Sequence, residues 1–202
     1  MAATVAPATS DRSDFRTVTV GGAKLGVATA VAVVAFLAAS RLVPIAGGLR
    51  GGVLGLIVLA AGLAAAFLPA QWTAARSTEG IAGAAAIGLV ATVVFSAIDI
   101  ALLRPFKAYP WTWDAIGGGS TWWYLPIWWM LGTFLAWMGG IVTAASGEAT
   151  LVRRALPAVA GAIIVAAIGR LAGVPVAFSV VTGAAFTLAL AALALVALAR
   201  KG

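Results

Sequence analysis

Hydrophobic residues follow one another in long runs, and short segments between the runs hold most of the charged residues. Each run is about twenty residues long, which is what a helix rising 1.5 Å per residue needs to cross a hydrocarbon core of about 30 Å. Backbone groups in lipid must hydrogen-bond within the chain, and no alternating strand pattern is visible, so each run is predicted to be a helix. The runs cover residues 24–44, 52–69, 80–103, 127–146, 155–173 and 176–199. The predicted fold is therefore all-α, a polytopic bundle of six transmembrane spans.

The domain organisation follows from where the apolar runs begin. Residues 1–22 are small, polar and mixed in charge, and we expect them to form an N-terminal tail. Residues 23–202 are then a single transmembrane domain. The fifth and sixth runs are separated only by the segment RLAGVP, where Gly173 and Pro175 favour a tight turn.

Composition supports lipid as the main solvent and limits the chemistry. Of 202 residues, 63% are hydrophobic and 9% are charged, whereas about a quarter of a soluble domain is charged. There is no cysteine and no histidine, which excludes disulfides, thiol catalysis and imidazole ligation of haem, copper or zinc. The six acidic residues are scattered along the chain, so we expect no metal site and no cofactor.

The net charge of +7 does not indicate nucleic-acid binding, because the basic residues are spread singly or in pairs between apolar runs. They read as the Lys and Arg that flank membrane helices. Six spans place both ends of the chain on one side, and eight of the thirteen basic residues fall there. This distribution predicts cytoplasmic termini, and the Ala- and Gly-rich composition suggests a bacterial inner membrane.

Tryptophan is concentrated in residues 109–129, which hold six of the eight indole rings. Indole prefers the headgroup boundary, so an aromatic belt is the plain interpretation. Belts usually draw on several helix ends, whereas here one loop supplies nearly all the tryptophans, which suggests instead an interfacial cap between the third and fourth spans. Trp129, Thr133 and Trp137 lie four apart and predict a stripe that either lines a ligand groove or, more commonly, contacts lipid or a neighbouring helix. The residues of this candidate cap or groove are Trp111, Trp113, Trp122, Trp123, Trp128, Trp129 and Trp137.

Asp99 is the only acid within a predicted span, and such groups normally face protein or water. Arg104 is five residues away and therefore points elsewhere on a regular helix, so a partner from another helix is favoured. Arg41 and Arg170 lie at the same predicted end of their helices, and the candidate buried charge cluster comprises Asp99, Arg41, Arg170 and Arg104. The alternative is that each arginine reaches the interface with no partner.

Small residues recur four apart in several spans and predict close helix packing. They are Gly51 and Gly55; Gly132, Ala136 and Gly140; and Ser179, Gly183 and Thr187.

No phosphate loop, nucleophile elbow, HExxH motif or dinucleotide fingerprint is present, which disfavours an enzyme. Two function classes remain. The first is a non-catalytic structural or accessory subunit that packs against other membrane proteins or further copies of itself in the bilayer. The second is a small-solute or ion transporter or channel that uses Asp99, an outer-side arginine and the Trp-rich cap. The first is favoured because the inner halves of the spans offer only hydroxyls such as Thr92, Thr143 and Thr187.

Overall fold

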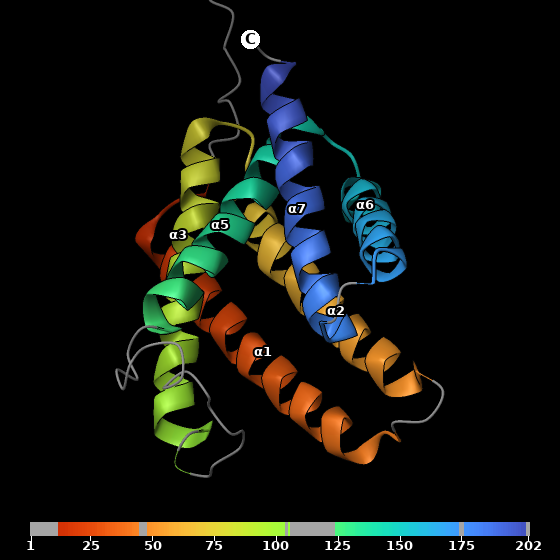
Figure 1. Ribbon diagram of the computed structural model, residues 1–202. Coiled ribbons are helices and arrows are strands. Elements are labelled where there is room, and N and C mark those ends of the chain that lie inside the picture. Colours follow the sequence, from red (N-terminus) through yellow and green to blue (C-terminus); the bar gives the residue numbers. More distant parts are fainter. Residues whose placement is uncertain (1–11, 45–47, 104, 106–123, 174–175, 201–202) are drawn as a thin grey trace, which may run out of the picture.

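The chain folds into a bundle of long helices, as its apolar runs predict (Figure 1). The computed structural model describes residues 12–44, 48–103, 105, 124–173 and 176–200. The helices are α1 Phe15–Leu42, α2 Leu49–Trp72, α3 Thr78–Ile98, α5 Tyr124–Ala145, α6 Leu151–Leu171 and α7 Phe178–Ala199, and a π-helical turn, η2 Asp99–Leu103, continues α3. Six helices of the described part are long and apolar enough to cross a membrane. The chain is therefore a multi-pass integral membrane protein.

The first helix begins earlier than the sequence suggests. It starts at Phe15 and not at Lys24, so residues 15–22 are helical and do not belong to the polar tail. Asp14 caps the start, because its carboxylate accepts the backbone N–H of Thr17 at 3.1 Å and the Thr17 hydroxyl at 2.6 Å. Thr19 turns its hydroxyl onto the Phe15 carbonyl at 2.8 Å. These bonds let the threonines join a helix that their polarity argues against.

The cap on α1 makes its first turn sensitive to acid. Hydrogen bonds from the Thr17 hydroxyl and then from its backbone N–H lower the pKa of Asp14. A lowered pKa in the folded state gives stability that is present above the pKa of the unfolded chain and is lost as pH falls through the folded-state value. We expect hydrogen exchange in the first turn, corrected for intrinsic rates, to accelerate on acidification. Asp14→Asn retains an acceptor oxygen but cannot ionise, so it should abolish the pH dependence of exchange. If exchange in this variant still accelerates in acid, another group is responsible.

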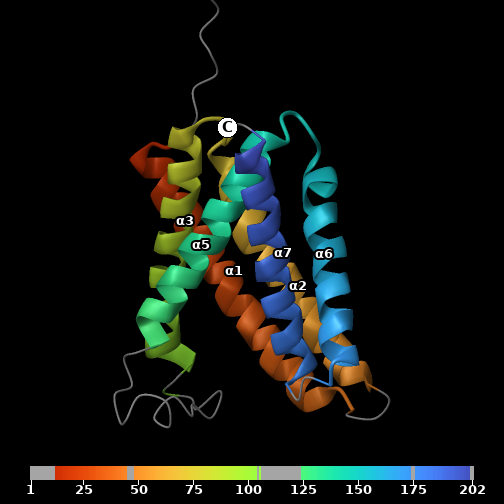
Figure 2. The same cartoon turned by 45° about the horizontal axis from the view of Figure 1, so that its top comes forward.

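Helix α2 contacts all five of the other long helices (Figures 1 and 2). On one side, α3 packs between α1 and α5, and on the other, α6 packs chiefly against α7 at the edge of the bundle. Consecutive helices alternate in direction, so α1 begins and α7 ends on the same face, called here the terminal face (Figure 2). Since α1 and α3 both start there, they run side by side near their beginnings and diverge toward the opposite face.

Close approach of small residues holds the centre of the bundle. Gly88 of α3 faces the backbone of Gly132, and a Cβ on Gly88 would lie 2.7 Å from the Cβ of Ala136. Gly139 of α5 lies against the backbone of Ala66 in α2, with no room for a Cβ. Small residues four apart on α5 thus lie at helix contacts, as predicted. Lipid supplies no hydrophobic force between helices, so such van der Waals packing is a main source of their association.

Candidate functional site

Asp99 lies where α3 changes from α-helix to π-helix. Its side chain is buried, with 1% of its surface exposed. The π-turn η2 ends at Leu103, two residues before Pro105, which has no backbone N–H to continue an α-helical ladder. Single π-turns inside helices often occur at functional sites. A buried carboxylate on such a turn is the most unusual polar group of the described spans.

Two hydroxyl groups precede Asp99 along α3, but each donates its hydrogen to a carbonyl of the same helix. Ser96 donates to the Thr92 carbonyl at 2.7 Å, and Thr92 donates to the carbonyls of Leu89 at 2.9 Å and Gly88 at 3.1 Å. The Ser96 oxygen still accepts the indole N–H of Trp129 from α5 at 3.3 Å. This hydrogen bond ties α5 to α3 one turn before Asp99.

Two of the candidate cap tryptophans pack against α3, and a third is about half exposed. The ring of Trp128 meets Phe95 edge-on, with centroids 5.8 Å apart and planes at 69°. Trp129 bonds to α3, and Thr133 donates its hydroxyl to the Trp129 carbonyl at 2.7 Å. Trp137 remains 48% exposed. The stripe of residues 129, 133 and 137 is therefore part helix contact and part outer surface.

The fold separates one arginine of the candidate charge cluster from Asp99. Arg170 is exposed in the last turn of α6, which packs against α7 and α2, whereas α3 packs against α1 and α5. The two helices lie on opposite sides of the bundle in both views (Figures 1 and 2). Arg41 is exposed in the last turn of α1. Arg104 and the tryptophans at 111, 113, 122 and 123 lie outside the described residues, so their part in a cluster or a cap stays a prediction.

From the level of Asp99 toward the terminal face, the contact between α3 and α5 becomes apolar and closed. Ile87, Ala84 and Ala136 have no exposed surface, and the glycines at 88 and 132 bring the two backbones together. On the terminal side of Thr92, the buried described residues of α3 are apolar or glycine. The same holds for the buried residues of α5 up to Thr143, which is buried near the end of that helix. Along the described contact between α3 and α5, the polar groups near Asp99 thus do not continue as a line to the terminal face.

A further polar group, Lys24, lies on the outer surface of α1. It is one of the basic residues that the sequence predicts on the side of the chain termini. Lys24 is exposed nine residues after the start of α1, about 14 Å along its axis. Its neighbours on the same face are exposed valines, 45% to 63% exposed, namely Val20, Val27, Val31 and Val34. These positions alternate four and three apart, a sequence signal from which this face could have been predicted. Lys24 therefore interrupts an otherwise apolar stripe.

Comparison with known proteins adds no assignment. No family model matches this chain, and neither the curated proteins nor the solved structures contain a match. Among the described residues, no group of three or more Asp, Glu, His or Cys side chains is placed to hold a metal ion. Function must therefore be argued from the geometry of α1, of Asp99 and of the two faces.

Proposed function

We propose that the chain is a non-catalytic structural or accessory subunit of a membrane complex, and that α1 provides the docking surface. The observation that carries the proposal is Lys24 within the exposed valine stripe of α1. A charged side chain at the centre of a bilayer costs about 2.5–3.5 kcal/mol on insertion scales, and less toward the surface. A helix that faced only lipid has no need of such a residue, whereas a carboxylate on a neighbouring helix offsets its cost.

The spacing of the stripe also suits a partner helix. Val20, Val27 and Val34 are seven residues apart, and Lys24 and Val31 form the second seven-residue series between them. This is the seam along which two helices pack side by side, with one polar residue setting the register. The expected partner is a transmembrane helix that carries an Asp or Glu at the depth of Lys24.

The tightly packed interior supports a subunit more than a carrier. Between Asp99 and the terminal face, glycine contacts join α2, α3 and α5 backbone to backbone. A transported solute would have to separate them. The distribution of charge supports cytoplasmic termini: six described arginines lie near the terminal face, three near the opposite face. Those near the terminal face are Arg12, Arg16, Arg76, Arg153, Arg154 and Arg200, and those near the opposite face are Arg41, Arg50 and Arg170. Under this proposal the protein resides in a bacterial inner membrane.

Purification from native membranes in mild detergent tests the proposal. We expect the chain to co-purify at fixed stoichiometry with a second membrane protein, identified by mass spectrometry, that carries an intramembrane acid. Lys24→Glu should abolish this association by like-charge repulsion, while Lys24→Arg should retain it. An acid-to-Lys change in the identified partner should restore binding to Lys24→Glu. Recovery of the chain alone, before and after crosslinking, would contradict the proposal.

Transport of a small solute or an ion is the second candidate, and the buried Asp99 on a π-turn favours it. In proteoliposomes, Asp99→Asn separates the two functions within the same experiment. Ion or proton flux through the unmodified chain that collapses in this variant, with helicity retained, would replace the subunit proposal. Under the subunit proposal, the flux equals that of protein-free vesicles for both proteins.

A further inference from the structure

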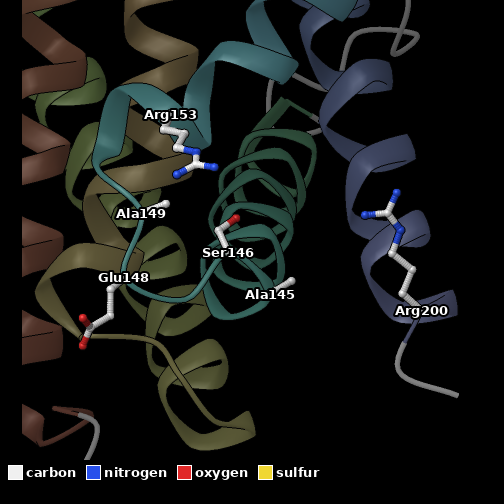
Figure 3. Close-up of a pocket in the computed structure, with 6 residues that line it drawn as sticks. All are labelled: Ala145, Ser146, Glu148, Ala149, Arg153 and Arg200. Carbon is white, nitrogen blue, oxygen red and sulfur yellow. The ribbon is translucent and has the colours of Figure 1, made fainter.

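A shallow pocket of about 640 Å³ opens on the terminal face, where α5 ends, α6 begins and α7 ends (Figure 3). Its lining residues are Ala145, Ser146, Glu148, Ala149, Arg153 and Arg200. From these groups we infer that the pocket binds the phosphate of an anionic phospholipid headgroup. This inference goes beyond the proposed function, because it concerns lipid and not a protein partner.

Two cations dominate the pocket. The side chains of Arg153 and Arg200 enter it from different helices, with Ser146 between them (Figure 3). The Glu148 carboxylate points away from both guanidinium groups, and it lies 3.7 Å from a guanidinium nitrogen of Arg76 outside the pocket. Its charge is thus offset elsewhere, which leaves the pocket positive. A guanidinium group can donate two parallel N–H hydrogen bonds to two oxygens of one phosphate. A halide ion offers no such pair of acceptor atoms, so the two arginines favour phosphate.

The pocket walls are held by hydrogen bonds that do not use these two guanidinium groups. Arg154 donates from Nη2 to the Gly147 carbonyl at 2.6 Å and so fixes the turn between α5 and α6. Ser146 donates its hydroxyl to the Val142 carbonyl at 2.6 Å, so the anion must be held by the arginines. The Thr150 side chain caps α6 by accepting the Arg153 N–H at 3.4 Å, and the positive end of this helix adds to the attraction.

The surroundings of the pocket favour a lipid over a free phosphate. It lies at the ends of three membrane-spanning helices, which is the level of the headgroups. Below it, α6 and α7 pack together and expose large apolar side chains. Val152 and Leu156 on α6, and Leu195 and Leu198 on α7, offer a surface for acyl chains. A headgroup on the arginines and chains along these helices satisfy both ends of one phospholipid.

Native mass spectrometry of the full chain in detergent tests the inference with dioleoyl phosphatidylglycerol, dioleoyl phosphatidylcholine and glycerol 3-phosphate. We expect phosphatidylglycerol to bind about 25-fold more tightly than phosphatidylcholine, since each of the two arginines contributes about a factor of five. Arg153→Gln/Arg200→Gln should remove this preference. The matched pair Arg50→Gln/Arg170→Gln on the opposite face should retain it.

Each other outcome overturns the inference. A preference that survives Arg153→Gln/Arg200→Gln places the lipid elsewhere, and glycerol 3-phosphate binding as tightly as phosphatidylglycerol makes the pocket a free-phosphate site. If the double variant does not fold, the headgroup preferences of Arg153→Gln and of Arg200→Gln are each compared with that of the unmodified chain. Phosphatidylglycerol should raise the melting temperature of the unmodified chain more than phosphatidylcholine does, and equal shifts would reject a specific headgroup site.

Discussion

Adding one methyl group at Gly139 is expected to destabilise the bundle by about 3 kcal/mol, the upper end for overpacking, because backbone and not a side chain is in the way. A Cβ on Gly139 would overlap the carbonyl group of Ala66, where α5 crosses α2. A flexible side chain can rotate away from such a clash, whereas a backbone carbonyl moves only if the whole helix moves. The crossing joins the two halves of the bundle, since α2 contacts every other helix.

Gly52→Ala in α2 is the matched control for Gly139→Ala. No heavy atom would lie within 4 Å of its new Cβ, and the position is helical. This variant should change stability by no more than about 1 kcal/mol, in the stabilising direction, because alanine restricts the unfolded chain. Unfolding in mixed micelles with increasing dodecyl sulfate, followed by circular dichroism, compares the two. Equal stability of the two variants would mean that α5 and α2 do not approach as closely as described.

The helices themselves could be predicted from the sequence, because the length of an apolar run and the bilayer thickness together fix a membrane span. Six spans also determine that both ends share a face. The four-residue spacing of Gly132, Ala136 and Gly140 indicated a contact face on α5, and these residues do meet α3. Each of these features is local in sequence, or follows from counting.

Lateral neighbours could not be predicted, because nothing in one helix states which other helix lies beside it. Arg41 and Arg170 have similar sequence surroundings, yet α6 lies across the bundle from α3, so Arg170 is not beside Asp99. The π-turn at Asp99 does not follow from the apolar run, although Pro105 shortly after it is a local signal of an altered helix end.

Replacing Phe186 with alanine is expected to cost about 3 kcal/mol, a typical value for removing a buried aromatic ring. Phe186 is 2% exposed and packs in the largest buried cluster of the bundle, together with Phe67 and Leu190. In lipid the loss is one of packing, because the cavity leaves neighbouring atoms without partners. Leu188→Ala on the same helix is the control. Leu188 is 61% exposed, lipid fills the space it leaves, and the change should be under about 1 kcal/mol.

A double-mutant cycle with Gly62 tests whether this ring is what keeps α2 and α7 in register. A Cβ on Gly62 would lie 2.9 Å from Cδ1 of Phe186, so Gly62→Ala alone should destabilise the bundle by pushing the ring off α2. In the Phe186→Ala background the same methyl enters the vacated space and should be neutral or stabilising. The coupling between the two changes should therefore be about 1–2 kcal/mol, within the range for residues in contact. Additive effects would show that α2 and α7 are held together by other residues, and that the glycine at 62 accommodates something other than this ring.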